Sequence, residues 1–328
     1  MSTYLITGGA GFVGSHLAEA LLDQGHHVII LDDLSSGSMG NVEHLRTHGA
    51  LEFIVGGLKS FSLLEELVDR SDVIYHLAAS VGVFNIIESP VRTVENNIGG
   101  TQSVLRAASV RKRKVIVAST SEVYGKSVDS PFREDGDLVL GPSSKARWSY
   151  AASKLVDEFL ALAYWREHQV PTVVVRLFNT IGPRQTGQYG MVVPRFITQA
   201  LRGQNLTVFG NGQQTRCFTC VYDVVEWLQR LASEKAAIAR VFNLGNPREI
   251  SIEELARLVI RLTGAQVGID YIPYEKAYDP GFEDMERRVP DISRVVETTG
   301  YRPRYSLEET LGVTIDSIRT QQTWPPVP

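Results

Sequence analysis

A glycine-rich segment that directly follows a short apolar stretch constrains the fold of this chain more than any other feature. Residues 7–14 read TGGAGFVG, and the apolar residues 4–6 before them predict a buried strand. Gly8 permits a tight turn, Gly11 lets a pyrophosphate approach the backbone, and Gly14 lets the next helix pack closely on the strand. That helix presents unpaired N–H groups and a partial positive charge to phosphates. The pattern therefore predicts a dinucleotide-binding turn.

The second predicted strand, residues 27–31, ends at an acidic residue that indicates which dinucleotide is bound. The carboxylate of Asp32 can accept both ribose hydroxyls of NAD and would repel the 2′-phosphate of NADP. The alternative interpretation is a structural turn followed by a solvated acid pair, Asp32 and Asp33. The motif in its context favours NAD as the cofactor.

The bulk properties of the chain exclude several classes of protein. Its 328 residues are 43% hydrophobic and 21% charged, which suits a folded α/β unit with a smaller second lobe. The net charge of −4, without a long basic run, argues against nucleic acid as a partner. No apolar run approaches the ~20 residues that cross a bilayer, and the N-terminus enters a strand at once. We therefore expect no membrane association and a cytoplasmic location.

Strand-like and helix-like segments alternate through the first half of the chain, which predicts a Rossmann-type doubly wound parallel sheet. The predicted strands are residues 4–7, 27–31, 51–55, 73–77, 114–119 and 172–176, and the predicted helices are residues 14–24, 62–70, 91–109 and 149–168. We expect an NAD-binding domain over residues 1–178, to which the chain returns around residues 217–245. Residues 179–328 are then a smaller α+β lobe that binds substrate. Within it we expect helices at 193–202 and 221–232, strands at 206–210 and 241–244, a capping box of Ser251 and Glu254, and an extended proline-rich tail.

The cysteines of the chain, Cys217 and Cys220, form a CxxC pattern. A redox pair or half of a zinc site is one interpretation. No second ligand pair stands at metal-site spacing, and the pattern does not open a helix after a thioredoxin-like strand. Two free thiols in a partly buried strand are the better interpretation, and we expect no metal. His76, at a strand end, is expected to be structural.

Tyr150 and Lys154 are the strongest candidates for catalysis. Their spacing of four places both side chains on one face of a helix. The lysine ammonium and a positive nicotinamide ring would bring the phenol pKa down from its usual value of ~10 toward neutral pH. The alternative is a surface pair on a helix. Thr120, at the end of a preceding strand, could hydrogen-bond the hydroxyl that Tyr150 deprotonates, or it could cap backbone groups.

With these motifs in view, the chain resembles the extended short-chain dehydrogenase/reductases, in the branch of nucleotide-sugar epimerases, dehydratases and decarboxylases. The motifs that carry this resemblance run over nearly the whole chain: TGGAGFVG, LDDLSSG, HLAA at 76–79, Asn97-x-x-Gly100-Thr101, STSEVYG, SYAASK, RLFNTIGPR, GNGQQTRCF and RRVPDIS. The resemblance implies that NAD contacts Gly8, Gly11, Phe12, Val13, Gly14, Asp32, Ser36, Gly37, Leu58, Leu77, Ala78, Ala79, Asn97, Tyr150 and Lys154.

One position departs from the family pattern. Members usually carry an acid after the third strand that holds the adenine amino group, whereas this chain reads Gly56-Gly57-Leu58. Glycine in place of the acid removes one adenine hydrogen bond, or leaves it to water, which could weaken NAD binding by about 1 kcal/mol.

The resemblance implies a shared first step, in which Tyr150 takes the proton of the sugar 4-hydroxyl as C4 gives hydride to NAD. Return of hydride to the opposite face gives a 4-epimer, a C6 carboxylate allows decarboxylation, and a C6 hydroxyl allows dehydration. Related dehydratases have Thr-Asp-Glu, but this chain has Thr120, Ser121 and Glu122, so dehydration is disfavoured.

Two reactions remain open from the resemblance. The Thr-Ser-Glu triplet, QTR at 214–216 and PDI at 290–292 are similar to UDP-glucuronate decarboxylases. GPRQTGQYGMVVPRF at 182–196 resembles bacterial 4-epimerase-like proteins. We expect a UDP-sugar 4-epimerase acting on a UDP-hexuronic acid, such as UDP-glucuronate, or on a UDP-hexose, with UDP-glucuronate decarboxylation as the alternative. A non-catalytic NAD-sensing protein is a third option, although such proteins usually lose the tyrosine or the lysine.

The resemblance also implies substrate contacts and a partner. The substrate-binding residues are expected to be Thr120, Asn179, Arg184, Val193, Arg216 and Arg288. Asn179 would contact the diphosphate, Arg216 and Arg288 the phosphates or ribose, and Arg184 a C6 carboxylate, with surface salt bridges as the alternative for each arginine. By analogy with relatives, a homodimer would form through the long helices at 91–109 and 149–168.

Overall fold

The computed structural model describes residues 1–80, 89–187, 191–273 and 287–320. Its largest element is a seven-stranded sheet in the order β11-β6-β5-β4-β1-β2-β3, with every neighbouring pair parallel. The strands are β1 (Thr3–Thr7), β2 (His27–Asp32), β3 (Leu51–Val55), β4 (Val73–His76), β5 (Lys114–Thr120), β6 (Thr172–Leu177) and β11 (Arg240–Leu244). The predicted doubly wound parallel sheet is confirmed.

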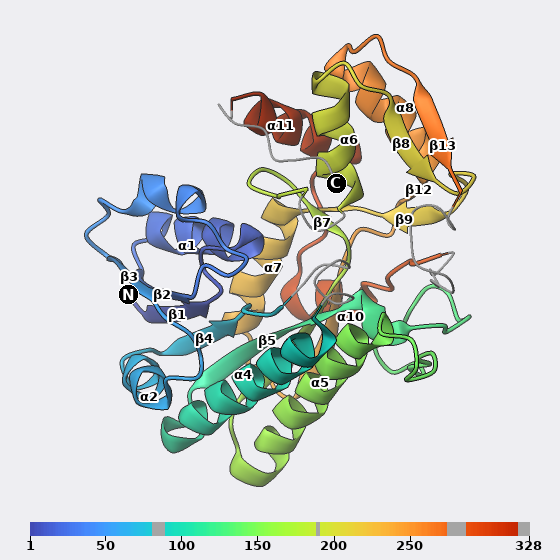
Figure 1. Cartoon of the computed structure of the whole chain (residues 1–328). Coiled ribbons are helices and arrows are strands. Elements are labelled where there is room, and N and C mark those ends of the chain that lie inside the picture. The colour runs from blue at the N-terminus through green and yellow to red at the C-terminus, as the bar shows by residue number, and fades with distance from the viewer. Residues whose placement is uncertain (81–88, 188–190, 274–286, 321–328) are drawn as a thin grey trace.

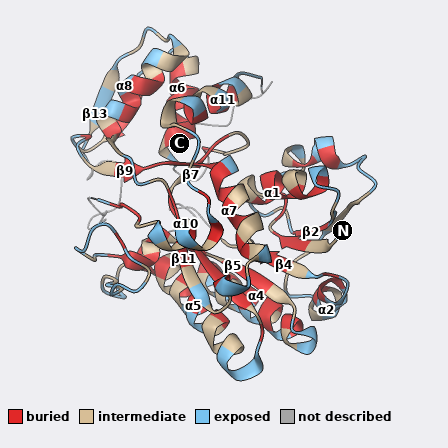
Figure 2. Ribbon diagram, turned by 180° about the vertical axis from the view of Figure 1, so that it is seen from behind, coloured by how far each residue is buried: buried red, intermediate tan, exposed pale blue. Residues whose placement is uncertain are grey.

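Helices cover both faces of this sheet, so its strands are buried on both sides (Figures 1 and 2). One face packs against α1 (Phe12–Asp23), α7 (Val221–Ser233) and α10 (Ser293–Thr299). The other face packs against α2 (Phe61–Asp69), α4 (Pro90–Arg111) and α5 (Trp148–His168). Two-sided burial explains why the strands read as nearly continuous apolar runs rather than as alternating ones.

A second, smaller lobe is built on helices α6 (Val192–Leu201), α8 (Ile252–Thr263) and α11 (Leu307–Thr320). It carries three short two-stranded sheets, which pair β8 (Leu206–Phe209) with β13 (Ile269–Ile272), β9 (Thr215–Cys217) with β12 (Glu249–Ser251), and β7 (Thr180–Ile181) with β10 (Thr219–Cys220). The predicted capping box of Ser251 and Glu254 starts α8. The short 3-10 turns are η1 (Met39–Asn41), η2 (Glu43–Leu45), η3 (Ser121–Tyr124) and η4 (Lys235–Ala237).

The chain crosses between the two lobes more than once. Residues 221–244 return to the large sheet as α7 and β11, and β11 pairs with β6 at its edge. The chain returns again with α10, whose Val295 packs in the same core as Tyr301. The sequence prediction contained the first return and not the second. The predicted proline-rich tail at 323–328 lies outside the described residues.

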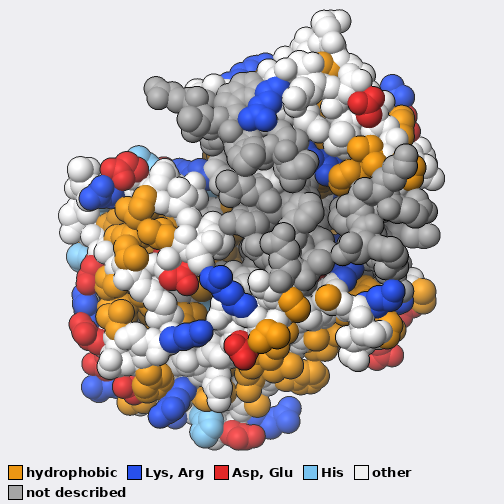
Figure 3. All heavy atoms as spheres, in the orientation of Figure 1, with side chains coloured by type: hydrophobic (Ala, Val, Ile, Leu, Met, Phe, Trp, Pro, Cys, Tyr) orange, Lys and Arg blue, Asp and Glu red, His pale blue; other side chains and the backbone are white. Residues whose placement is uncertain are grey.

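The surface carries mixed charge. On the face shown in Figure 3, acidic and basic side chains are scattered among each other over the described part of the chain. Within the described residues, no helix is both long and apolar enough to span a bilayer.

Candidate active site

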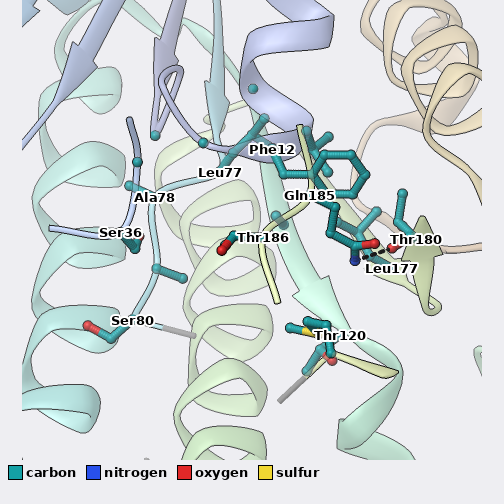
Figure 4. A pocket seen from close by; sticks show the side chains of 18 of the residues that line it. Phe12, Ser36, Leu77, Ala78, Ser80, Thr120, Leu177, Thr180, Gln185 and Thr186 are labelled. Carbon is teal, nitrogen blue, oxygen red and sulfur yellow. Dashed lines mark hydrogen bonds between the residues drawn. The ribbon is translucent and has the colours of Figure 1, made fainter. Parts of the chain in front are cut away.

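A large cavity of about 2050 Å³ opens where the carboxyl ends of the parallel strands face the smaller lobe. Ligands of open α/β sheets bind at this edge. Pockets for a single small ligand usually measure ~300–1,000 Å³, so this cavity has room for a dinucleotide and a second molecule. Its walls draw side chains from both lobes, as the close view shows for Phe12, Ser36, Thr120 and Gln185 (Figure 4).

The glycine-rich turn has the geometry that a dinucleotide requires. Gly8 has φ +76, and a Cβ there would lie 2.7 Å from the backbone nitrogen of Ala78. A Cβ at Gly14 would overlap the carbonyl oxygen of Gly8, so the helix packs as closely on the turn as the sequence predicted. Helix α1 has no side-chain cap and no acid in its first turn. Its first N–H groups therefore face the cavity and suit a pyrophosphate.

Asp32 lies at the end of β2, on the wall of the cavity. Its carboxylate accepts hydrogen bonds from the backbone N–H groups of Ala10 and Leu34, each at 2.9 Å. Burial raises the pKa of Asp32, while these two hydrogen bonds oppose the rise. Because the backbone fixes the carboxylate, Asp32 is placed to receive ribose hydroxyls, and the residues present fit NAD.

The cavity wall contains most of the predicted site residues. These are Gly8, Gly11, Phe12, Val13, Gly14, Asp32, Ser36, Gly37, Leu58, Leu77, Ala78, Ala79, Thr120, Ser121, Glu122, Tyr150, Asn179, Arg184, Val193, Arg216 and Arg288. Asn97 and Lys154 are absent from this set. The side chain of Asn97 accepts from the N–H of Ser80 at 2.8 Å and donates to the Ser153 hydroxyl at 3.1 Å. Asn97 therefore supports the wall from behind, and the predicted direct contact with NAD stays a prediction.

Tyr150 and Thr120 meet at the floor of the cavity, where α5 begins beside the end of β5. Burial raises the pKa of the Tyr150 phenol, Glu122 and Asp157 raise it further, and a hydrogen bond to Thr120 opposes them. The expected lowering of this pKa by Lys154 together with a bound nicotinamide ring stays a prediction. The ammonium of Lys154 is occupied by the carboxylate of Asp157, 2.6 Å away.

Glu122 lies between two buried arginines. Its Oε2 is 3.7 Å from Nη1 of Arg147, and its Oε1 is 3.8 Å from Nη1 of Arg288. The relative exposures of the two arginines are 8% and 6%, and both line the cavity. Two guanidinium groups therefore stand beside one carboxylate in this part of the wall, and guanidinium groups are common partners of anionic ligands.

The remaining predicted polar residues have partners that narrow their roles. Arg184 forms an ion pair with Glu19, and its Nη1 lies 3.4 Å from the hydroxyl of Ser15; Glu19 and Ser15 are both on α1. The contact of Arg184 with a C6 carboxylate stays a prediction. The amide nitrogen of Asn179 donates one hydrogen bond to the carbonyl of Cys217 at 2.9 Å. Nη1 of Arg216 donates to the carbonyl of Thr215 at 2.7 Å.

The sequence analysis did not select Arg147 and Asp157 as site residues. Arg147 stands three positions before Tyr150 and Asp157 three positions after Lys154. The spacing of Asp157 from Lys154 on a helix was a signal that could have revealed that pair. The contact between Arg147 and Glu122 joins distant parts of the sequence and gives no local signal.

The remaining candidates are structural. Both thiols are free and buried, Cys217 in β9 and Cys220 in β10, and burial raises the pKa of Cys217 to about 12. His76 lies 2.8 Å from the hydroxyl of Thr7 and 3.1 Å from that of Thr101, and burial lowers its pKa to about 3. Among the described residues, no group of three or more His, Cys, Asp or Glu side chains is placed to hold a metal ion.

Comparison with known proteins agrees with this site. A family model described as GDP-mannose 4,6 dehydratase matches residues 5–314. The chain is 43% identical to a UDP-N-acetyl-alpha-D-glucosaminuronate decarboxylase of Bacillus cytotoxicus, over 96% of this chain and 97% of the relative. It is 39% identical to UDP-glucuronic acid decarboxylase 1 of Xenopus tropicalis, over 97% of this chain and 72% of the relative.

A solved structure with the same fold is the UDP-glucuronic acid 4-epimerase of Bacillus cereus in complex with UDP-glucuronic acid and NAD. It is 31% identical to this chain, with a TM-score of 0.87, and the match covers 97% of this chain and 99% of that one. The fold and the site are thus those of an extended short-chain dehydrogenase/reductase that uses NAD on nucleotide sugars. The chain belongs to the nucleotide-sugar epimerase and dehydratase family that the GDP-mannose 4,6 dehydratase model describes.

Proposed function

We propose that this protein is an NAD-dependent decarboxylase of a UDP-hexuronic acid, either UDP-glucuronate or its 2-acetamido analogue. The observation that carries the proposal is the similarity to two decarboxylases, 43% and 39% identical over nearly the whole chain. The guanidinium groups of Arg147 and Arg288, which line the cavity on either side of Glu122, are also of a type that binds carboxylates.

NAD, when bound, supplies a reversible hydride acceptor. Thr120 orients the sugar 4-hydroxyl, and Tyr150 takes its proton as C4 is oxidised to a ketone. The C6 carboxylate is then β to that ketone. Carbon dioxide leaves, and the electrons of the C5–C6 bond collect as an enolate on the oxygen at C4, which the Tyr150 hydroxyl holds by a hydrogen bond. A proton taken from water at C5 restores the C4 ketone, and return of hydride to C4 with the Tyr150 proton to its oxygen completes a decarboxylated UDP-sugar.

The charges around the site suit this sequence of steps. The arginines beside Glu122 favour entry of a carboxylated sugar, while Glu122 offsets part of their charge. A carboxylate held too firmly by arginine would be stabilised in the ground state and would lose carbon dioxide more slowly. Pairing of both arginines with Glu122 would weaken such a hold.

The 4-epimerisation that the sequence first predicted is the second candidate. It is supported by the likeness to the Bacillus cereus UDP-glucuronic acid 4-epimerase, at 31% identity. Dehydration has less support, because Ser121 stands where related dehydratases carry an aspartate.

The test is incubation of the purified, NAD-loaded protein with each UDP-hexuronic acid, followed by mass spectrometry of the nucleotide products. Loss of carbon dioxide supports the proposal, and a product of unchanged mass with an inverted C4 favours epimerisation. A Tyr150→Phe variant should lose about 10²–10⁴-fold in rate, as expected for removal of a general base.

We also propose that the protein forms a homodimer through α4 and α5. These helices pack side by side on one face of the sheet (Figure 1). Some of their apolar side chains are exposed. Phe159 is 66% exposed and Val156, one turn before it on α5, is 39% exposed. Burial of such a stripe against a second copy would remove apolar surface from water.

A further inference from the structure

A buried ion pair lies on α5 one to two turns after Tyr150. The ammonium of Lys154 donates to Oδ2 of Asp157 at 2.6 Å, one turn further along α5. Lys154 is 2% exposed and Asp157 is fully buried, and neither lines the cavity, whereas Tyr150 does. The ammonium that was expected to act on the phenol is therefore paired with a negative charge.

The carboxylate of Asp157 does not use all of its hydrogen-bonding capacity. Its second oxygen, Oδ1, has no hydrogen-bond partner among the described residues. A buried polar atom without a partner costs about 1–3 kcal/mol, so a carboxylate kept in this position contributes poorly to stability. Such groups concentrate at functional sites, where their charge is used.

The groups around Asp157 come from several elements. Lys154 and Glu158 face it from α5, and Thr101 faces it from α4; burial raises the pKa of Asp157, while Lys154 and Thr101 oppose the rise. Thr101 contacts His76 of β4, which contacts Thr7 of β1. His76 is neutral at working pH, because burial lowers its pKa to about 3.

The charges that face Tyr150 are Glu122 from η3 and the Lys154–Asp157 pair from α5. The charge of Glu122 is offset by Arg147 and Arg288. No residue within the described parts of α5 offsets Asp157 except Lys154. Asp157 therefore raises the pKa of the phenol and at the same time holds the Lys154 ammonium in an ion pair.

We propose that Asp157 is a positioning residue that holds the Lys154 ammonium behind the phenol, offsets its charge, and so sets the pH at which Tyr150 takes a proton from substrate. The inference rests on the proposed role of Tyr150 as the base, and it is independent of whether decarboxylation or epimerisation follows. It assigns a function to a residue that touches neither the cavity nor a substrate.

The direct test is an ultraviolet difference titration of tyrosinate in the NAD-saturated protein, with Tyr150→Phe run in parallel to subtract the other tyrosines. Asp157→Asn keeps the shape of the side chain and can still accept from Lys154, but it removes the charge. The Tyr150 midpoint should fall by about one pH unit. The acid limb of the kcat profile should move to lower pH by the same amount. Asp157→Glu, which restores the charge, should return both toward the wild-type values.

Asp223→Asn is the matched control. Asp223 is also a fully buried carboxylate, but it lies on α7, where it accepts from the Tyr301 hydroxyl at 2.6 Å and from the N–H of Arg304 at 2.9 Å. This variant should be less stable and should leave the Tyr150 midpoint unchanged. If Asp157→Asn does not fold, Asp157→Ser removes the same charge, leaves space for water, and carries the same prediction.

The outcomes separate the inference from the function it rests on. A Tyr150 midpoint that is the same in Asp157→Asn, Asp223→Asn and wild type would overturn the inference and leave Asp157 a structural residue. Full activity of Tyr150→Phe would instead overturn the role of Tyr150 itself, whatever the Asp157 variants do.

Discussion

Nη1 of Arg147 lies 3.7 Å from Oε2 of Glu122, although the two residues come from different elements of the large sheet and its helices. Arg147 is the N-cap residue immediately before α5, and Glu122 lies in the 3-10 turn after β5. Because Arg147 stands three positions before Tyr150, this ion pair lies close to Tyr150 along the chain. Glu122 is one of the groups that raise the pKa of the phenol, and an opposite charge beside it should weaken that effect.

Replacement of Arg147 should move the pH dependence of the reaction in the direction opposite to that expected for Asp157. In Arg147→Gln, the charge of Glu122 is less compensated, so the pKa of Tyr150 rises further and the acid limb of kcat/KM moves to higher pH. Activity at neutral pH should fall about tenfold. Arg46→Gln, which breaks an exposed pair with Glu43, is the control and should leave the profile unchanged. An unmoved acid limb in Arg147→Gln would mean that Arg147 does not act on the site.

Restoring an acid after β3 should tighten NAD binding. Gly57 lines the cavity, and a Cβ there would meet no atom within 4 Å, so a side chain fits without strain. A carboxylate at this position can accept from the adenine amino group, and Gly57→Asp should gain about 1 kcal/mol, or roughly fivefold in Kd. Isothermal titration calorimetry with NAD measures this change in Kd. Gly57→Ala separates the carboxylate from backbone effects, and equal affinities for the Asp and Ala variants would contradict the assignment.

The protein should lose stability as the pH falls below 6.5, partly through His16. This side chain lies on α1 with Nε2 2.9 Å from the carbonyl of Pro183, and burial lowers its pKa to about 4. Because the folded-state pKa lies below the unfolded value of ~6.5, the unfolded chain binds more protons between these values. The loss attributable to His16 between pH 6.5 and 4 should be about 2 kcal/mol after allowance for partial solvation.

His16→Gln is the matched variant, since its amide can still donate to Pro183 but does not titrate. Denaturant unfolding at several pH values should show a shallower decline for His16→Gln than for wild type. Parallel curves would mean that His16 is not protonated on unfolding in this range.

The proposed dimer surface makes a separate prediction. Phe159→Asp places a charge in the exposed apolar stripe of α5 and should convert a dimer into a monomer, which sedimentation velocity would detect. Val128→Asp, a 92% exposed residue outside α4 and α5, should leave the assembly unchanged. A wild-type protein that sediments as a monomer would reject the surface outright.

The sequence was sufficient for the local parts of the fold. The strand over 51–55 was predicted to the residue, and the ends of β1, β4 and β5 differ by one residue, because each strand is an apolar run bounded by polar residues or glycine. The second return of the chain through α10 was not predictable in this way. This return depends on the packing of Val295 against a core whose residues are distant in the sequence, and no local sequence pattern predicts that contact.

The same limit applied to the site. The glycine-rich turn, Asp32, Thr120 and Tyr150 lie next to one another because their motifs end strands or begin helices at one edge of the sheet. The ion-pair partner of an arginine is set by tertiary packing and could not be predicted from the sequence. Arg184 was assigned to a substrate carboxylate, and the structure gives it Glu19 as a partner.

The central claim, decarboxylation, is tested most directly with UDP-glucuronate that carries an isotope label at C6, and with its 2-acetamido analogue labelled in the same way. The NAD-loaded protein is incubated with each, and the released gas and the nucleotide product are analysed together. The account predicts that the label appears in carbon dioxide and that the UDP-sugar product lacks C6. Retention of the label in a UDP-hexuronate with inverted configuration at C4 would contradict it and establish the epimerase instead.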